Sequence, residues 1–494
     1  MATAPRSFSG ACLYLAGLAA TGLLLLGLTP APTAPPAPDP ELAAEIDDLL
    51  QRGRSNLAFW GLHVRDLETG RVLYGHNASK AFLPASNQKV FTVAAAIGTL
   101  GSTYRYETEL AFDGVVQDAT MRGDLVIRGS GDPTFGSREV RGRDPLARWA
   151  KRLAAMGVRR IEGRLIGDDN VFDDQPYSEG WDVDYLTRQA GRYMGVSAGG
   201  LSYSDNVVAV RIESGAPGQP PRITTRPANV VHIENRATTS ARRRGPDVVV
   251  NRSFQSNRII VEGSVPRAYR GIKEVPVSNP TMLTLQAFRN ALADAGIATN
   301  LEVADIDDVT EKPSGAGMPL FVALSPPLAE IAAILNKESN NFYAEQLFRT
   351  YGWGGAARGG SRRTESFLAR AGVNRRAVQV RDGSGLSRKD LITPQAMTEL
   401  LAYMNRHPER EAFLATLPQG GERGTTLEYR LRNVPVQAKT GSLQFTRALS
   451  GYATRPNGQR VAFALFANNY TGPSYRITNV FDRVVRMLTS NPPS

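Results

Sequence analysis

The spacing of hydrophobic and polar positions divides the 494-residue chain into regions with helix-like and regions with strand-like patterns. Apolar residues from Leu42 to Leu50 repeat at helical spacing, and a hairpin pattern then precedes an apolar helix over 86–101. Between about residues 103 and 275, short alternating segments typical of strands predominate, with one helical stretch among them. After Pro280 the pattern becomes helical, and the chain ends with strands and a closing helix. This order predicts one α/β domain interrupted by a β-rich insertion.

We therefore expect a domain split between residues 41–105 and 277–494, with the insertion at 106–276. Residues 1–40 form a separate part: an uncharged apolar stretch at 11–28 and a linker rich in proline and alanine. The apolar stretch is typical of an export signal. A retained membrane anchor is the alternative, because its length is marginal for crossing a bilayer. We expect the remaining chain to be exported to the periplasm or cell envelope, with membrane contact only through 11–28.

Composition narrows the possible functions. Hydrophobic residues make up 42% of the chain, which argues against disorder. The net charge of +11 arises from scattered arginines, so we expect no nucleic-acid partner. The four histidines are far apart and lack ligand-like spacing, so we expect no metal site. The single cysteine, Cys12, excludes internal disulfides.

Ser86 and Lys89 form an S-x-x-K pair at the predicted start of a helix. Residues three apart on a helix share one face, so the two side chains are expected to lie together. A serine hydroxyl is a poor nucleophile until a nearby base takes its proton. Lysine can act as that base when burial lowers its pKa, whereas arginine cannot. The alternative is an exposed helix start.

Lys439, Thr440 and Gly441 form a K-T-G sequence within a predicted strand. Alternation places Lys439 and Gly441 on one face of the strand and Thr440 on the other. Glycine at this position allows a ligand backbone to approach closely. If Lys439 shares a site with Lys89, their like charges lower each other's pKa. The alternative is an ordinary strand with an exposed lysine.

Two segments compete as a third element. Ser204-Asp205-Asn206 is a literal S-D-N sequence, whereas Ser339-Asn340-Asn341 reads S-N-N. We favour Ser339, because it lies at a junction of two predicted helices, where a loop can project side chains into a cleft. Ser204 leads directly into a strand of the insertion. A further short motif, G-x-S-x-G around Ser197, lacks the strand-to-helix context of a hydrolase nucleophile and is interpreted as a tight loop.

The three elements, in this order, resemble the S-x-x-K, S-x-N and K-T-G motifs of penicillin-recognising serine enzymes. Together with the segments at 128–135 and 380–394, they resemble the D-alanyl-D-alanine carboxypeptidase/endopeptidase family, the class C low-molecular-mass penicillin-binding proteins. The resemblance implies a penicillin-binding/β-lactamase-like transpeptidase domain of α/β (α+β) class, with an antiparallel sheet flanked by helices. One departure is Asn340, where many relatives carry aspartate.

The resemblance also implies the roles of the residues. Ser86 attacks the carbonyl of the penultimate D-Ala and forms an acyl-enzyme after Lys89 takes its proton. Ser339 relays a proton to the leaving group, and Asn341 binds a substrate amide. Lys439 and Thr440 bind the terminal carboxylate or tune Ser339.

The strand that carries Gly441 is expected to hold the peptide stem by edge pairing. The backbone N–H groups of Ser86 and Ser442 form the oxyanion hole. Peptidoglycan stem peptides are the implied substrates and β-lactams the implied inhibitors, with no metal or organic cofactor.

The sequence leaves two other functional interpretations open. A β-lactamase or esterase would use the same chemistry, although a β-lactamase normally lacks so long an insertion. A non-catalytic cell-wall-binding protein would have no need of three intact motifs. The balance between carboxypeptidase and endopeptidase activity is left open, as are the role of the insertion and the oligomeric state.

Overall fold

The computed structural model describes residues 40–52, 57–140, 144–187, 195–243, 245, 247–313 and 317–490. The apolar stretch at 11–28 and Cys12, with the linker up to residue 39, lie outside these ranges. Within them, none of the helices combines the length and the apolar character needed to cross a membrane.

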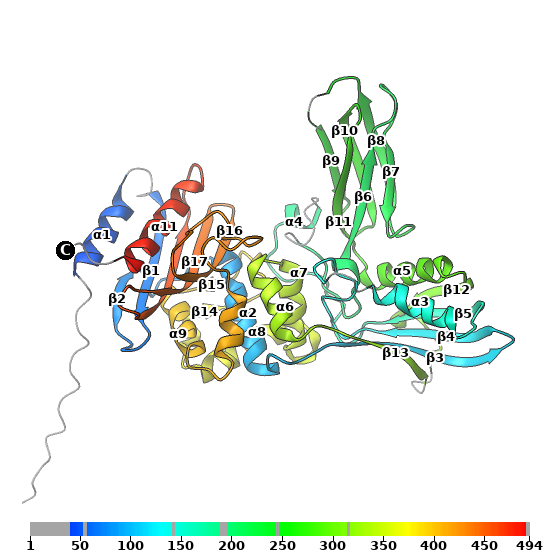
Figure 1. Cartoon of the computed structure of the whole chain (residues 1–494), viewed down its shortest axis with the longest axis horizontal. Coiled ribbons are helices and arrows are strands. Elements are labelled where there is room, and N and C mark those ends of the chain that lie inside the picture. The colour runs from blue at the N-terminus through cyan, green and yellow to red at the C-terminus, as the bar shows by residue number, and fades with distance from the viewer. Residues whose placement is uncertain are drawn as a thin grey trace, which may run out of the picture. The chain divides into compact units, whose positions relative to one another are not determined.

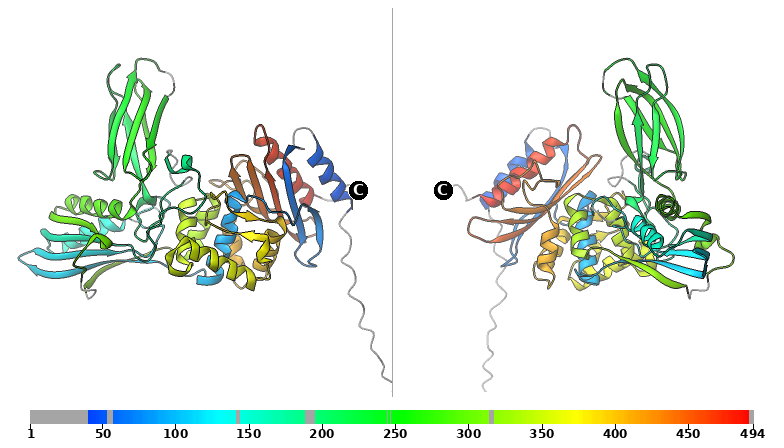
Figure 2. Two further views of the ribbon diagram at one scale, coloured as in Figure 1. Left: turned by 180° about the vertical axis from the view of Figure 1, so that it is seen from behind. Right: turned by 45° about the vertical axis from the view of Figure 1, so that its right-hand side comes forward.

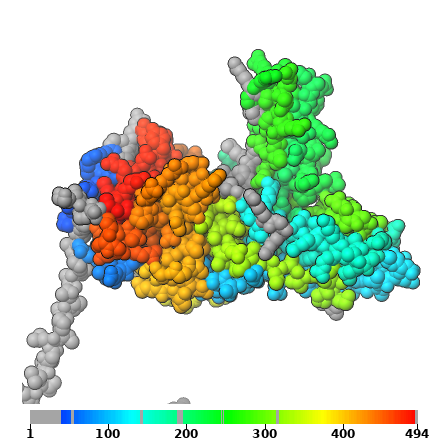
Figure 3. Space-filling model, viewed as in Figure 1, coloured from blue at the N-terminus to red at the C-terminus, as the bar shows by residue number. Residues whose placement is uncertain are grey.

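An antiparallel sheet joins the two ends of the chain (Figure 1). Its order is β16 (Val436–Leu443), β17 (Thr446–Thr454), β18 (Arg460–Asn468), β1 (Phe59–Asp66) and β2 (Val72–His76). In β1, Phe59 pairs with Asn468, and the register continues to Asp66 opposite Val461. Figure 3 shows the blue N-terminal and red C-terminal segments side by side. The predicted hairpin is confirmed, and segments from the two ends of the chain pair directly through β1 and β18.

Helices cover both faces of this sheet, as the two views of Figure 2 show. On one face, α1 (Pro40–Gln51) and α11 (Tyr475–Thr489) pack together, and Trp60 of β1 meets Phe481 of α11 edge to face. The other face carries the larger helical layer. It consists of α2 (Gln88–Leu100), α6 (Leu328–Lys337), α7 (Asn341–Thr350), α8 (Ala357–Arg370), α9 (Pro394–Met404) and α10 (Arg410–Thr416).

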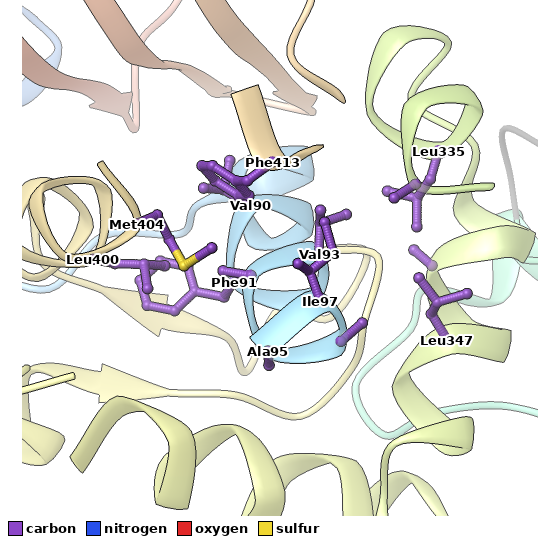
Figure 4. Close-up of a cluster of buried hydrophobic side chains, with 14 of the residues drawn as sticks. Val90, Phe91, Val93, Ala95, Ile97, Leu335, Leu347, Leu400, Met404 and Phe413 are labelled. Atoms are coloured by element: carbon purple, nitrogen blue, oxygen red, sulfur yellow. The ribbon is translucent and has the colours of Figure 1, made fainter. Parts of the chain in front are cut away.

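Helix α2 lies inside this layer, with every residue from Gln88 to Ile97 buried. A helix that is apolar almost all round is stable only when neighbours cover it on all sides. Figure 4 shows how this happens: Val93 and Ile97 point toward Leu335 and Leu347, while Phe91 lies near the α9 side chains. The fold thus buries the helix that carries the S-x-x-K pair, together with its lysine.

The insertion is built on a second five-stranded sheet with mixed pairing. Its order is β12 (Ala298–Asp305), β5 (Arg160–Asp168), β4 (Thr120–Arg128), β3 (Glu107–Gln117) and β13 (Met318–Leu324). Helices α3 (Pro145–Ala155) and α5 (Pro280–Asp294) share one core with this sheet, in which Trp149 meets Phe288 edge to face.

Two three-stranded sheets follow β5 in the chain. One has the order β8 (His232–Ser240), β10 (Arg258–Pro266), β9 (Asp247–Arg252), and the other β11 (Arg270–Pro276), β6 (Val207–Glu213), β7 (Arg222–Arg226). The remaining elements are short: α4 (Val183–Thr187), β14 (Val378–Gln379), β15 (Leu391–Ile392), and the 3₁₀ turns η2 (Ala85–Asn87), η4 (Ser204–Asn206), η5 (Ile306–Asp308), η6 (Trp353–Gly355) and η7 (Arg375–Ala377).

The expected boundary at residue 276 does not coincide with the end of this second sheet. Strands β12 and β13 hydrogen-bond to β5 and β3, so the chain up to Leu324 belongs to the same layer. The sequence changes from strand-like to helical at Pro280, but α5 packs on the inserted sheet and not on the sheet that joins the two ends of the chain. We therefore propose that the insertion extends over 106–324, past the change from a strand-like to a helical sequence pattern at Pro280.

Candidate active site

Ser86 lies in the turn η2, which runs directly into α2. The preceding residue, Ala85, has φ 48°, a left-handed conformation that is costly for a residue with a Cβ and recurs at functional sites. Asn87 Nδ2 donates to the carbonyl of Lys439 at 3.0 Å, which fixes the turn against β16. The predicted helix thus begins with a 3₁₀ turn that presents the serine hydroxyl.

Lys89 lies in the first turn of α2, and its Nζ donates to Ser86 Oγ at 3.2 Å. The amine also donates to Asn341 Oδ1 at 2.5 Å and to the carbonyl of Ser384 at 2.6 Å. Complete burial lowers the pKa of Lys89 to about 7, although nearby carboxylates, foremost Asp382, act in the opposite direction. A substantial fraction of this amine is therefore neutral near neutral pH and can accept a proton.

Lys439 follows the alternation predicted for its strand. Lys439 and Gly441 are buried, whereas Thr440 is half-buried and Ser442 is exposed. Lys439 Nζ donates to Ser339 Oγ and to the carbonyl of Thr440, both at 2.9 Å. Burial, and secondly the charge of Lys89, hold the pKa of Lys439 well below its usual value. The S-N-N and K-T-G segments therefore meet.

Ser339 and Asn341 flank the N-terminus of α7. Ser339 has φ 61° at the junction with α6. Asn340 is the N-cap of α7, and its side chain accepts the backbone N–H of Tyr343 at 3.1 Å. Asparagine and aspartate are about equally good N-caps. Asn340 in place of aspartate thus retains the capping interaction, and Asn341 remains directed at Lys89.

A cavity of about 260 Å³ opens at Ser86. Its lining consists of Ser86, Tyr185, Glu338, Ser339, Asn341, Leu386, Thr426, Thr440, Ser442 and Leu443. Five of the residues predicted from the motifs line this cavity. Lys89 and Lys439 do not line it. Both are buried, and their amines contact Ser86 and Ser339. Gly441 passes close to the serine turn: a Cβ there would lie 2.8 Å from the carbonyl oxygen of Pro84.

The glycine-rich loop at 382–387 forms part of the wall of this site. The side chain of Asp382 accepts the backbone N–H groups of Gly385 at 2.6 Å and Ser387 at 2.8 Å. Gly385 has φ 82°, and a Cβ at this residue would lie 1.9 Å from the carbonyl oxygen of Ala85. The loop therefore needs glycine to approach the turn that carries the nucleophile candidate.

Sequence reasoning missed several residues of the site. Tyr185 comes from α4 in the insertion, and no pattern around it indicated a role. Glu345 is a buried carboxyl group in α7, four residues after Asn341. The signal available for Glu345 was an acidic residue among the apolar positions of a helix, which is rare unless the charge is paired.

The alternative motifs serve other structural purposes. Asn206, in the literal S-D-N segment at 204–206, donates to the carbonyl of Ser197 at 2.9 Å and to Ser202 Oγ at 3.0 Å. Ser197 itself is buried and donates to the carbonyl of Val277 at 2.8 Å. These contacts hold a loop of the insertion, and neither Ser204 nor Ser197 lines the cavity at Ser86.

One group of acidic side chains in the described part of the chain has the spacing of a metal site. Oxygens of Asp169, Asp174 and Asp307 lie within 4.8 Å of one another. These residues belong to the insertion and are exposed or half-buried, and the cavity at Ser86 is lined by other residues.

The antiparallel sheet, the buried S-x-x-K helix and the two lysine–serine contacts together define a serine hydrolase of the penicillin-binding/β-lactamase-like fold. The chain belongs to the D-Ala-D-Ala carboxypeptidase 3 (S13) family, which matches residues 42–489. The predicted fold class and enzyme class, a serine-type D-Ala-D-Ala carboxypeptidase, are thereby confirmed.

Relatives of this chain span most of its length. A D-alanyl-D-alanine carboxypeptidase of Actinomadura sp. is 32% identical over 478 residues, covering 92% of this chain and 86% of the relative. The crystal structure of penicillin-binding protein 4 (dacB) from Haemophilus influenzae matches with a TM-score of 0.77 and 24% identity, covering 90% of this chain and 99% of the other. The same protein complexed with a novel β-lactam matches with a TM-score of 0.72 and 23% identity, covering 91% and 99%.

Proposed function

We propose that Ser86 is the nucleophile of the D-Ala-D-Ala carboxypeptidase reaction and that Lys89 is its general base. The observation that carries this proposal is the contact of 3.2 Å between Lys89 Nζ and Ser86 Oγ, made by an amine whose pKa lies near 7. The neutral amine takes the hydroxyl proton while Ser86 Oγ attacks the carbonyl carbon of the penultimate residue. The C–N bond to the terminal D-Ala then breaks, and the acyl group remains on Ser86 until water releases it.

The second lysine–serine pair serves the leaving group. Ser339 Oγ delivers a proton to the departing amine, and the proton that Lys89 took from Ser86 restores the Ser339 hydroxyl. Lys439 orients that hydroxyl through its contact of 2.9 Å. Asn341 holds Lys89 and binds a substrate amide, and Thr440 binds the terminal carboxylate at the exposed side of the strand. The backbone N–H groups of Ser86 and Ser442 stabilise the developing oxyanion.

The test is the Ser86→Ala variant. We expect it to lose covalent labelling by fluorescent penicillin and the release of D-Ala from a pentapeptide, with an unchanged melting temperature. Ser202→Ala is the matched control, because Ser202 is a buried serine of the insertion outside the cavity. D-Ala release by Ser86→Ala at the wild-type rate would overturn the assignment.

Peptidoglycan stem peptides are the proposed substrates, and β-lactams the proposed inhibitors. The family supports the first, and the β-lactam complex of the Haemophilus influenzae relative supports the second. A β-lactamase would instead turn over a chromogenic cephalosporin rapidly and retain no lasting label. Stable labelling at Ser86 separates the two. Release of a cross-linked dimer, followed beside D-Ala release, measures any endopeptidase activity.

The proposed location is the cell envelope after export, with membrane contact only through residues 11–28. Intact-mass measurement of the exported protein, with and without penicillin, tests this proposal together with acylation. Loss of the first residues from the mass indicates a cleaved signal, whereas the full mass in the membrane fraction indicates a retained anchor. The full mass in a soluble fraction would contradict both.

A further inference from the structure

Glu345 is a buried acid that the reaction steps above do not use. Only 1% of its surface is exposed, and its Oε1 accepts the backbone N–H groups of Gly383 at 3.0 Å and Ser384 at 2.9 Å. Two backbone donors on one carboxylate oxygen fix the course of the glycine-rich loop at this point. Helix α7 therefore anchors the loop from below.

Ser384, whose backbone N–H bonds to Glu345, also contacts Lys89 through its carbonyl group. The carbonyl of Ser384 accepts Lys89 Nζ at 2.6 Å, and the same amine contacts Ser86. A chain of hydrogen bonds thus runs from Glu345 through the backbone of Ser384 to Lys89. Any shift of this backbone changes the position of the amine relative to Ser86 Oγ.

The insertion is part of the same network. Ser178 Oγ donates to Glu345 Oε2 at 2.7 Å, and Trp181 Nε1 donates to Asp382 Oδ2 at 2.8 Å. Both acceptors belong to the residues that hold the glycine-rich loop. The inserted segment therefore completes the hydrogen bonds of two acids under the active site, in addition to supplying Tyr185 to the cavity wall.

Charges around Lys89 come from several elements. The carboxyl groups of Asp382, Glu345 and Asp390 face it, and each favours the ammonium form. On the opposite side, Lys439 is affected by the charge of Lys89. Of the three acids, Asp390 has its pKa held well above the usual value, chiefly by burial.

Opposing interactions act on the ionisation of Glu345. Burial and the charge of Asp382 raise its pKa, whereas the hydrogen bond from Ser178 and the guanidinium of Arg349 lower it. Arg349 is in turn held by an ion pair with Asp173 of the insertion at 2.6 Å. The insertion thus supports the ionised form of Glu345 directly through Ser178, and it holds the guanidinium of Arg349 in place through Asp173.

We propose that Glu345 is a positioning residue for Lys89, and that the insertion holds it in place through Ser178. The carboxylate fixes Ser384 so that its carbonyl directs the amine at Ser86, and its charge stabilises the ammonium formed when Lys89 takes the proton. This inference rests on the proposed function, since it assumes that Lys89 is the base in acylation.

The first test measures penicillin acylation of Glu345→Gln against pH. Glutamine keeps the size of the side chain and an oxygen that can accept the loop N–H groups, but removes the charge. Loss of a nearby negative charge lowers the pKa of Lys89, so we expect the acid limb of the acylation rate to move to lower pH by about one pH unit. We also expect the limiting rate to fall by about ten-fold, because the ammonium is less stabilised. A purely structural role would not move the acid limb.

The second test uses Ser178→Ala, a milder change in the insertion. Without its donor, Glu345 ionises at higher pH, so the acid limb moves in the same direction by a smaller amount. Ser202→Ala is the matched control, because Ser202 is also a buried serine of the insertion and contacts Gln346, the neighbour of Glu345, at 3.3 Å. We expect this control to keep the wild-type profile.

The outcomes separate this inference from the proposed function. If wild-type protein fails to acylate at Ser86, the proposed function is wrong. If the wild type acylates and folded Glu345→Gln keeps both the wild-type acid limb and limiting rate, Glu345 does not position Lys89. If Ser178→Ala matches Ser202→Ala while Glu345→Gln shifts the limb, the role assigned to the insertion is wrong.

Discussion

Lys439 Nζ lies 2.9 Å from Ser339 Oγ, although the two residues are 100 positions apart in the chain. Lys439 is fully buried, and burial, with the charge of Lys89 second, holds its pKa well below the usual value, which favours the neutral amine. A neutral amine can both donate a hydrogen bond and accept a proton. This pair is therefore suited to passing a proton, which an ordinary ammonium–hydroxyl contact is not.

Removal of this relay is expected to slow acylation without unfolding the protein. For Ser339→Ala we predict a loss of about 10²- to 10⁴-fold in the rate of penicillin acylation, the usual contribution of a positioned proton donor. Stopped-flow fluorescence with a labelled penicillin measures it. Ser197→Ala is the control, because Ser197 is a buried serine of the insertion that donates to the carbonyl of Val277 and does not line the cavity at Ser86. Equal rates for the two variants would contradict the relay.

Lys89→Arg is expected to abolish acylation even where the protein folds. Arginine keeps a positive charge near Asn341 but cannot lose its proton at any accessible pH, so it cannot act as a base. Mass spectrometry after incubation with penicillin measures the acylated fraction. Lys89→Met tests the effect of losing the charge with similar volume, and we expect it to be equally inactive. Normal labelling of the arginine variant would show that another group takes the proton.

We expect the rate of acylation to fall as the pH is lowered. Only the neutral form of Lys89 accepts a proton, and the pKa of this residue is about 7. As pH falls below that value the amine becomes charged, so the acylation rate is expected to fall about ten-fold for each further pH unit. Above pH 8 we expect a plateau. A rate that is flat between pH 5 and pH 8 would be inconsistent with Lys89 as the base.

Asn340 provides a test of whether residue 340 acts only as the N-cap of α7. Asn340→Asp preserves an oxygen that caps α7, so we expect a change in the free energy of unfolding below about 1 kcal/mol and acylation close to wild type. Asn340→Ala removes the cap and is expected to cost about 1 kcal/mol. Denaturant unfolding of the three proteins compares these values. A large loss of activity in the aspartate variant alone would show that residue 340 affects chemistry beyond capping.

The motif residues could be predicted because their spacing is local. Ser86 and Lys89 lie one helical turn apart, and alternation along β16 separates Lys439 from Thr440. The choice of Ser339 over the literal S-D-N segment depended on the helix junction, which the structure also contains at the start of α7. What the local pattern could not supply was the distance between the segments, because it is set by the packing of the whole domain.

The acids beneath the site and the end of the insertion could not be predicted for the same reason. Glu345 gains its hydrogen-bond partners only when the loop at 382–387 folds onto α7 and Ser178 of the insertion contacts its carboxyl group. Likewise, the buried side chains of α5 share a core with the inserted sheet, which its local sequence pattern does not specify. Pairing of β12 with β5, which is a long-range event, decides that it belongs to the insertion.

The contact between the glycine-rich loop and the serine turn gives a final prediction. Gly385 and Gly372 both have positive φ, 82° and 74°, so alanine is strained at either position. They differ in the space around them. A Cβ at Gly385 would lie 1.9 Å from the carbonyl oxygen of Ala85, whereas a Cβ at Gly372 would meet nothing within 4 Å.

Gly372→Ala is therefore expected to lose about 1–2 kcal/mol of stability from backbone strain alone, with acylation unchanged. Gly385→Ala must also push the loop away from Ala85, which shifts the Ser384 carbonyl that holds Lys89. We expect a larger loss of stability and a fall in acylation of at least about ten-fold, because misplacement by a fraction of an ångström weakens a near-attack geometry. Thermal unfolding and acylation rates of both variants measure this difference. If the two alanine variants lose stability equally and acylate equally, the loop does not set the position of the base.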